Sequence, residues 1–506
     1  LIDDTSLWRD ELSTAYKVFQ PSLPFLLNYL RTDSHPPLYY VALWLLGRHL
    51  GESALLLRLV SWLAYAAGGL LMAGQAWLLA RSGRLPRPER ALGFALLLAF
   101  TSPFPVRYAI EAKGYAWLVA CLALALLCRQ RLLLAACERR WAGLVGYGMG
   151  LALAAASHYY GLIYAGCLLL VDGWVAIRRG TQAAGPRSAL ALTAGVAILP
   201  VLAWLVLAVD PAGAGGATSW IGSPDYGLLE DVLARFLGPY PLPKLIGVLL
   251  PLGWLLRTRR LRWQPVSAGG GGEASARAAV IWLDQSGLLA GLWLVVLVVA
   301  VSWVKPIAFA RYFIVLLPGL VVWLSCQLAR LEPSGRRVRS GLVLALALWV
   351  ISNWFQSFIG LTAVAGQVGP REDSNFRRVS LLAAPYPRRY GLTPRHLTTS
   401  DQLLAMEGVI PADRTPWRDL RQLADPELPL HPSPFIVAGT GGERLLQRKL
   451  DPRLQSLRQR GFRCRDLAVD QPHVRVFACG AAAAGAQPVS PSAEATGSGQ
   501  GEARRE

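Results

Sequence analysis

Residues 54–90 read ALLLRLVSWLAYAAGGLLMAGQAWLLA followed by RSGRLPRPER. The first part, residues 54–80, is an apolar run long enough for a helix to cross the roughly 30 Å hydrocarbon core of a bilayer. The second part, residues 81–90, contains four arginines. Short loops rich in Arg are typical of the cytoplasmic side of a membrane. The stretch therefore predicts a transmembrane helix that ends in the cytoplasm.

The same alternation continues along the chain. We expect about ten transmembrane helices, at residues 54–80, 91–106, 115–128, 141–156, 161–177, 188–208, 242–256, 280–304, 312–329 and 341–360. Five alternate loops (81–90, 129–140, 178–187, 257–279 and 330–339) contain 20 basic residues, whereas the four loops between them contain six if Lys244, at the start of run 242–256, is included. The positive-inside rule places the first set in the cytoplasm and both ends of the chain outside. An exported N-terminal segment needs a preceding helix, so we expect the natural chain to begin before Leu1.

The composition agrees with this topology. Of 506 residues, 53% are hydrophobic and 16% are charged, whereas a soluble domain has about 25% charged residues. An ordinary soluble enzyme, a coiled coil and a disordered chain are thereby excluded. The net charge of +19 could suggest nucleic acid, but the basic residues lie in short loops between apolar runs. We therefore expect membrane lipids, and no nucleic acid, as partners.

The chain divides into four parts. Residues 1–53 form an outer segment with interfacial helices, including one at 36–50 that opens with Pro36-Pro37. Residues 54–360 form the transmembrane bundle. Residues 361–479 form a small extracytoplasmic α/β domain, with strands at 434–438 and 473–478 and a helix at 442–460. Residues 480–506 are rich in Ala, Gly and Ser and are expected to be disordered. Cys464 and Cys479 could pair if this tail is exported.

The unusual polar residues fall in five outer segments. They are Asp10-Glu11, Asp33 to Tyr40 with His35, Arg107 to Tyr115 with Glu111 and Lys113, Ser157 to Tyr160 with His158 and Tyr159, and Lys305 to Tyr312 with Arg311. The predicted topology brings all five to the same membrane face. Carboxylates beside apolar surface can act as acids or bases, and Arg and Lys at the same level can hold a phosphate. A carboxylate base, a phosphate clamp and a lipid-facing groove suggest group transfer from a lipid-phosphate donor.

Each residue also has a structural interpretation. Asp10-Glu11 could be a solvated helix start, and Glu111 could form an ion pair with Lys113 or Arg107. His35 could merely mark the start of a helix, His158 could be a packed residue at a helix end, and Arg311 could anchor the chain at the interface. No cofactor is required by the pattern. A divalent cation, such as a zinc ion held by His35, His158 and carboxylates, stays open.

The order of these motifs resembles the GT-C glycosyltransferases, and more closely the bacterial branch of glycosyltransferase family thirty-nine, relatives of the dolichyl-phosphate-mannose–protein mannosyltransferases. The resemblance rests on Trp8-Arg-Asp10-Glu11, His35-Pro-Pro-Leu-Tyr-Tyr40, Leu57-Arg58-Leu-Val-Ser61, Glu111-Ala-Lys113-Gly-Tyr115, Ser157-His158-Tyr-Tyr-Gly161 and Arg311-Tyr312 through Leu317-Pro318. It covers residues 5 to about 320. Lys113-Gly114 departs from the family's Arg-Pro, and the usual first span is absent.

The resemblance implies an all-α polytopic membrane protein, a GT-C-like helical bundle, with a small C-terminal extracytoplasmic α/β domain. It implies an inverting glycosyltransferase of a bacterial inner membrane, with an extracytoplasmic active site, a polyprenyl-phosphate-sugar donor and a glycan, lipid or protein acceptor. Asp10 would be the base, and Glu11 and Glu111 would orient the acceptor or a cation. Lys113, Arg311 and Arg107 would hold the donor phosphate, and His35, His158 and Tyr159 would line the cavity.

Two other classes stay open. A transporter or flippase of a lipid-linked glycan would carry ionisable residues near the middle of the membrane. The interiors of runs 91–106, 188–208, 280–304 and 341–360 are expected to carry none, which favours chemistry at one surface. A structural scaffold would not bind lipid phosphate. The sequence leaves the sugar, the acceptor and the oligomeric state open.

Overall fold

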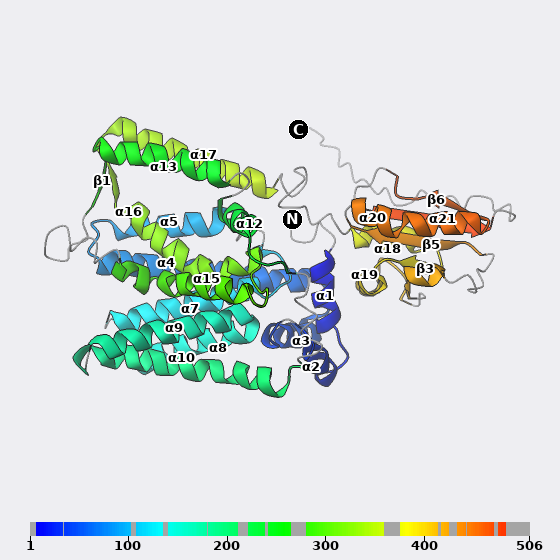
Figure 1. Ribbon diagram of the computed structural model, residues 1–506, viewed down its shortest axis with the longest axis horizontal. Helices are drawn as coiled ribbons and strands as arrows, with labels where there is room; N and C mark the ends of the chain where they lie inside the picture. The colour runs from blue at the N-terminus through cyan, green and yellow to red at the C-terminus, as the bar shows by residue number, and fades with distance from the viewer. Residues whose placement is uncertain are drawn as a thin grey trace, which may run out of the picture. The chain divides into compact units, whose positions relative to one another are not determined.

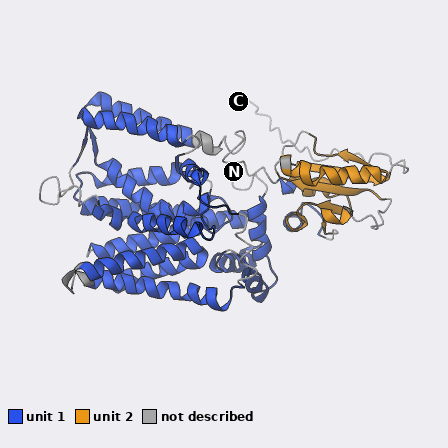
Figure 2. Ribbon diagram, viewed as in Figure 1, with its two compact units in different colours: residues 1–377, 399–412 blue, residues 378–398, 413–506 orange. Residues whose placement is uncertain are grey.

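The computed structural model describes residues 7–33, 35–102, 108–134, 140–179, 181–210, 221–237, 241–264, 280–358, 375–412, 416–424, 433–441, 443–469 and 474–481. The chain forms two compact units (Figure 2). The first unit contains residues 1–377 and 399–412, and the second contains residues 378–398 and 413–506.

The first unit is a helical bundle. Its N-terminal helices are α1 (Arg9–Val18), α2 (Leu23–Leu30) and α3 (Leu38–Leu50). The bundle helices are α4 (Ala54–Ser82), α5 (Pro88–Thr101), α7 (Tyr115–Leu133), α8 (Arg140–Ser157), α9 (Tyr159–Arg179), α10 (Thr181–Leu207), α12 (Tyr226–Leu237), α13 (Pro241–Arg257), α15 (Leu288–Ser302), the 3₁₀ segment η1 (Ala310–Leu316), α16 (Leu317–Ala329) and α17 (Arg336–Phe358). Helices α1, α2 and α3 lie together at one end of the bundle (Figure 1).

Each of the ten predicted apolar runs contains a helix. Within the described residues, five helices are long and apolar enough to cross a membrane: Ala54–Ser82, Tyr115–Leu133, Tyr159–Arg178, Gly185–Leu207 and Ala310–Ala329. The pair α12 and α13, bent by 61°, would make a sixth span. Helix α12 was not predicted, because residues 226–237 mix charged and apolar side chains.

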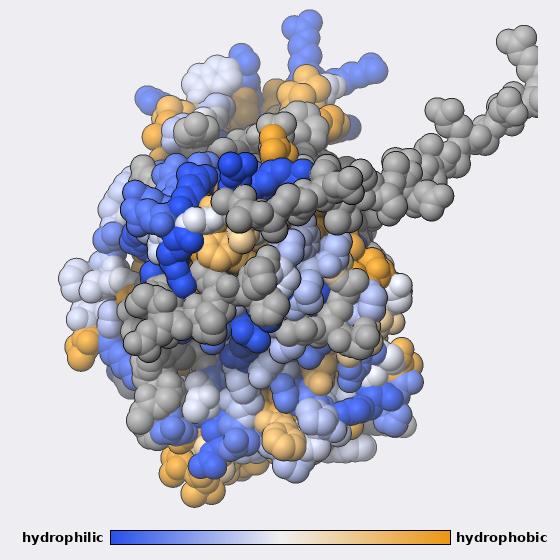
Figure 3. Space-filling model, turned by 90° about the vertical axis from the view of Figure 1, so that its right-hand side faces the viewer, coloured by the Kyte–Doolittle hydropathy of each residue, from blue (hydrophilic) through white to orange (hydrophobic). Residues whose placement is uncertain are grey.

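Exposed apolar side chains show which surfaces contact lipid. Large hydrophobic residues stand outward on α10, α13, α15 and α17, for example Val206, Leu250, Trp293 and Leu344. A soluble protein does not expose so much apolar area, because water disfavours it. The face in Figure 3, which belongs mainly to the C-terminal unit, mixes hydrophilic residues with scattered hydrophobic ones. In the first unit, the exposed apolar side chains lie along these helices, as in a membrane protein.

Small residues bring the central helices close together. A Cβ added at Gly68 of α4 would lie 3.0 Å from the Cα of Ala120 in α7, and one at Gly150 of α8 would lie 2.8 Å from the backbone nitrogen of Ala125. Such small-residue contacts are a common mode of helix packing in membranes, because they increase van der Waals contact between backbones. They hold α7, the helix that follows the Glu111–Tyr115 segment, against α4 and α8.

A buried ion network joins α7, α9 and α10 to the segment before α15. Arg129 donates to both oxygens of Asp172, at 2.9 and 2.7 Å, and to Asp284 at 2.8 Å. Arg187 also pairs with both carboxylates. The interior of run 280–304 was expected to carry no ionisable residue, and Asp284, near the start of this run and before α15, belongs to the network. Arg129 and Arg187 were assigned to cytoplasmic loops but lie inside helices, which pairing with buried carboxylates permits.

The first unit also contains a small sheet that the sequence did not indicate. Strand β1 (Leu261–Trp263) pairs antiparallel with β2 (Leu331–Pro333). Strand β1 lies at the end of the bundle opposite α1 (Figure 1). It follows α13, and β2 precedes α17, so the sheet ties together two helices that are far apart in sequence.

The C-terminal segment folds as an α/β structure, as predicted. Its strands are β3 (Arg389–Gly391), β4 (Arg418–Asp419), β5 (Phe435–Thr440), β6 (Phe462–Asp466) and β7 (Val474–Ala481), in the order β4-β3-β5-β7-β6. Its helices are α18 (Phe376–Ala383), α19 (Pro394–Met406), α20 (Glu443–Lys449) and α21 (Asp451–Gln459), and a 3₁₀ segment η3 spans Leu420–Ala424. The predicted helix 442–460 is thus broken in two, with Pro452 in the first turn of α21.

Cys464 and Cys479 form a disulfide between β6 and β7. The two residues are directly opposite in the antiparallel register, with Cα atoms 4.1 Å apart. The pairing that the sequence left open is therefore made. Strand β7 extends to Ala481, and residues 482–506, most of the predicted disordered tail, lie outside the described residues.

Candidate functional site

All five outer segments predicted to carry chemistry supply side chains to the same region of the first unit. Asp10 of α1 pairs with Arg311 of η1. The ring of His35 lies 5.2 Å from that of His158, and the ring of His158 lies 5.0 Å from that of Tyr312. Glu11 accepts a hydrogen bond from the backbone of Ala112. Segments up to 301 residues apart in the chain therefore converge.

Asp10 and Arg311 form a partly exposed ion pair in this region. Arg311 Nη1 donates to Asp10 Oδ2 at 2.8 Å, and the two side chains are 16% and 29% exposed. Burial alone would raise the pKa of Asp10, but the charges of Lys113 and Arg311 and the Arg311 hydrogen bond hold it below its usual value. Asp10 is therefore an ionised carboxylate that remains accessible.

Lys113 is a buried cation beside this pair. Its side chain is 6% exposed, and its charge acts on Asp10, His35 and His158. Within the described part of the chain, its ammonium group makes no hydrogen bond and no ion pair. A buried charge is costly unless a partner compensates it. Lys113 is thus suited to bind an anion.

Glu11 is fully engaged inside the protein. Its carboxylate accepts from Arg58 Nε at 2.9 Å and Arg58 Nη2 at 2.7 Å, and from the backbone nitrogens of Ala112 and Trp8 at 3.0 and 3.2 Å. Glu11 and Arg58 are both 0% exposed. A carboxylate has about four acceptor positions, and all are used. The geometry therefore fixes α1 against α4 and the 111–115 segment, and leaves Glu11 no position for a ligand.

Glu111 is a buried acid whose charge acts on both Tyr39 and Arg311. It is 1% exposed. Burial raises the pKa of Tyr39 above its usual value, and the charges of Glu11 and Glu111 add to this effect. The backbone nitrogen of Lys113 donates to the Glu111 carbonyl at 2.7 Å. This tight turn places Glu111 and Lys113 on the same short segment, before α7 begins.

His35 is oriented by an acidic neighbour. Asp33 Oδ1 accepts from the His35 backbone nitrogen at 3.0 Å and lies 3.1 Å from His35 Nδ1, and Lys17 forms an ion pair with the same carboxylate. Burial lowers the pKa of His35, although Asp33 opposes this effect. Desolvation would raise the pKa of Asp33, but His35 and Lys17 hold it well below its usual value. The sequence reasoning assigned no role to Lys17 and did not single out Asp33 as a positioning group.

His158 presents a hydrogen-bond donor to the site. Its Nδ1 accepts from the Tyr160 backbone nitrogen at 3.1 Å, so the neutral ring carries its proton on Nε2. Burial lowers the pKa of His158, and the charges of His35, Arg311 and Lys113 lower it further. His158 Nε2 is buried and has no partner among the described residues. It is therefore a neutral donor without an acceptor.

Aromatic rings form a wall beside His158. The rings of Tyr115, Tyr160 and Tyr312 lie 5.7, 5.7 and 5.0 Å from the His158 ring. Tyr108 makes an edge-to-face contact with Tyr115, with ring centres 5.0 Å apart, and its hydroxyl accepts from Arg235 of α12 at 2.8 Å. Arg235 was counted among the outer basic residues but not assigned to the site, since only the tertiary fold brings α12 to this wall.

Two more of the predicted site residues are Arg107 and Tyr159. Arg107 lies outside the described residues. Tyr159 is the first residue of α9 and is half-buried next to His158. In the described part of the chain, no group of three His, Cys, Asp or Glu side chains could hold a metal ion. The divalent cation therefore stays a prediction.

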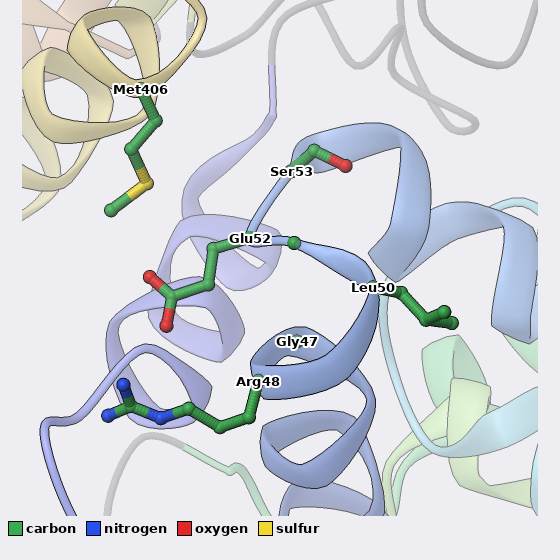
Figure 4. A pocket seen from close by; sticks show the side chains of 7 residues that line it. Gly47, Arg48, Leu50, Glu52, Ser53 and Met406 are labelled. Carbon is green, nitrogen blue, oxygen red and sulfur yellow. The ribbon is translucent and has the colours of Figure 1, made fainter.

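An open pocket of about 510 Å³ lies at the junction of α3 and α4 (Figure 4). It is lined by Gly47, Arg48, Leu50, Gly51, Glu52, Ser53 and Met406. None of the predicted site residues lines it, and it does not contribute to the site described here.

Comparison with known proteins places the fold. No protein-family model and no curated protein sequence matches the chain. The crystal structure of ArnT from Cupriavidus metallidurans bound to undecaprenyl phosphate matches with a TM-score of 0.52 and 15% identity, covering 94% of this chain and 95% of that one. The apo state of the same protein matches with a TM-score of 0.53 and 15% identity, covering 96% of each chain. The chain is thus an integral membrane protein with a GT-C-like fold, as predicted.

Proposed function

We propose that the protein is an inverting glycosyltransferase that moves a sugar from a polyprenyl-phosphate donor to an acceptor outside the cytoplasm. The observation that carries the proposal is the accessible Asp10–Arg311 pair beside the buried cation Lys113. A carboxylate and two cations supply the two functions that sugar transfer from a phosphate donor needs, a base and a stabilised leaving group.

The reaction follows from these positions. Asp10 takes the proton of the acceptor hydroxyl, and the acceptor oxygen forms a bond to the anomeric carbon. The bond between that carbon and the phosphate oxygen breaks, and its electron pair leaves with the polyprenyl phosphate. Lys113 and Arg311 hold the leaving phosphate, and the Nε2–H of His158 is a third donor for it. Glu111, His35 and Tyr159 line the acceptor side, and Glu11 positions α1 rather than contacting substrate.

The Asp10–Arg311 hydrogen bond gives a reason why the base is inactive without donor. An arginine that shares its charge with a carboxylate holds the pKa of that carboxylate low, and a low pKa makes a weak base. A donor phosphate would draw Arg311 away from Asp10. The pKa of Asp10 then rises towards the range in which it accepts a proton, so donor binding prepares the base.

Two features support an extracytoplasmic site. The site and the Arg-rich β1–β2 sheet lie at opposite ends of the first unit (Figure 1), and the positive-inside rule puts the Arg-rich end in the cytoplasm. The disulfide of Cys464 and Cys479 also suits an oxidising compartment.

The ArnT structure with undecaprenyl phosphate supports a polyprenyl-linked donor. The transporter alternative gains no support from the buried charges, since Arg129 and Arg187 pair with Asp172 and Asp284.

The Lys113→Met variant tests the donor site. Replacing a charged hydrogen-bond donor costs about 1.5–3 kcal/mol, so we expect polyprenyl phosphate to bind roughly 10–100-fold more weakly. Binding is measured on the full chain in nanodiscs by titration with polyprenyl phosphate. The matched control is Lys305→Met. This variant removes an exposed lysine from the last outer loop and should bind normally. Unchanged binding by Lys113→Met would remove Lys113 from the donor site.

A further inference from the structure

The β1–β2 sheet gathers two Arg-rich segments into one surface. Arg262 is opposite Glu332 in the antiparallel register, and the Arg260 carbonyl accepts from both the backbone nitrogen and the hydroxyl of Ser334, at 2.8 and 2.7 Å. Residues 254–262 and 331–339, which are about seventy positions apart in the chain, thereby become neighbours. We call these two segments the basic hairpin.

The basic hairpin carries a dense, exposed positive charge. Its exposed arginines are Arg257, Arg259, Arg260 and Arg262 on the first segment and Arg336, Arg337 and Arg339 on the second. Glu332 is the only acidic residue of the two segments. None of these arginines is paired with a carboxylate within 4 Å among the described residues. The arginines therefore have unused capacity for anions.

Arg259 has an unfavourable backbone conformation. Its φ is 54°, in the left-handed region after the end of α13. Glycine is the usual residue at such a helix end, because a Cβ is unfavourable there. The positive-inside rule accounts for basic residues in this loop in general. It does not account for an arginine at a position where the backbone favours glycine.

The neighbouring residues indicate which anion the surface meets. Strand β1 follows the lipid-facing helix α13, and β2 precedes α17, which also exposes apolar side chains. Trp254 is 52% exposed, and the Arg260 guanidinium lies 4.9 Å from the centre of its ring. Tryptophan next to arginine at the end of an apolar helix is typical of the headgroup level of a bilayer. A soluble anion would not require this position.

We propose that the basic hairpin binds the phosphates of anionic phospholipid headgroups in the cytoplasmic leaflet. The guanidinium group of arginine matches phosphate in charge and in bidentate geometry. Bound headgroups would neutralise the hairpin and hold α13 and α17 at a fixed depth in the membrane. This role is independent of the sugar-transfer site, which lies at the other end of the bundle.

The test compares lipid binding by the full chain with and without these charges. Native mass spectrometry in detergent measures retention of phosphatidylglycerol and of phosphatidylcholine. Each arginine near an anionic surface contributes about fivefold to binding, so the triple variant Arg259→Gln/Arg260→Gln/Arg262→Gln should lose roughly 100-fold in affinity for phosphatidylglycerol. The control Arg458→Gln/Arg463→Gln/Arg465→Gln removes three arginines of the C-terminal segment and should retain wild-type binding.

A single substitution separates charge from backbone effects. Arg259→Gly removes one charge and places glycine where φ is positive, so thermal stability should stay the same or rise while phosphatidylglycerol affinity falls about fivefold. Three results would overturn the proposal: wild-type affinity in both hairpin variants, equal binding of phosphatidylcholine, or displacement of the lipid by soluble glycerophosphoglycerol, which would indicate a site for free phosphate.

Discussion

The Asp10→Asn variant is expected to lose about 10²–10⁴-fold in kcat/KM for sugar transfer. Asparagine keeps the size of the side chain but cannot take the acceptor proton. Because Asp10 is partly exposed and pairs with Arg311 alone in the contacts described above, the variant should fold normally. Turnover is measured on purified protein in nanodiscs with a polyprenyl-phosphate sugar, by release of polyprenyl phosphate.

The matched control for Asp10 is Asp231→Asn. Asp231 is an exposed acid on α12 that makes no hydrogen bond or ion pair with a site residue among the described residues, although Arg235 of the same helix reaches Tyr108. The same chemical change there should leave turnover at the wild-type level. Binding of polyprenyl phosphate should survive in Asp10→Asn, since the substitution leaves Lys113 and Arg311 in place. If Asp10→Asn turns over like wild type, Asp10 is not the base.

The Arg58→Met variant is expected to be the most destabilising single change near the site. It leaves the carboxylate of Glu11 buried at 0% exposure without its guanidinium partner. Removing one member of a buried ion pair costs about 3–5 kcal/mol, because the remaining charge is uncompensated. The thermal unfolding midpoint of the detergent-solubilised protein should fall clearly, and activity should fall with it, since α1 carries Asp10.

A second variant shows that the buried charge is the cause. In Glu11→Gln/Arg58→Met the charge is removed together with its partner, and much of the stability should return. Arg421→Gln, which breaks an exposed pair with Asp419, should change the midpoint little. If Arg58→Met is as stable as wild type, the Glu11–Arg58 pair does not hold α1 in place.

Much of the fold could be predicted because the membrane restricts the choices. Each apolar run became a helix, since a chain in lipid must satisfy its backbone hydrogen bonds internally. The convergence of Asp10, His35, Glu111, His158 and Arg311 also followed from topology, because alternate loops lie on one side. The strand 434–438 was visible as a short continuous apolar run, and the strand 473–478 from its alternation of apolar and polar residues.

Other features depend on contacts that no local pattern encodes. Asp10 and Glu11 are adjacent in sequence, yet Glu11 is buried against Arg58 whereas Asp10 is accessible. This difference depends on which face of α1 packs against α4. Asp284 joins a network with Arg129 because three helices pack together. The β1–β2 sheet requires segments on either side of α15 and α16 to meet, and strands of three residues carry too little pattern to be recognised.

The most direct test of the account is a cryo-EM structure of the protein in nanodiscs with polyprenyl phosphate. The account predicts the phosphate within about 2.7–2.9 Å of Lys113 Nζ and the Arg311 guanidinium, the usual length of charge-assisted hydrogen bonds. A phosphate bound at the opposite end of the bundle, or away from both cations, would contradict it.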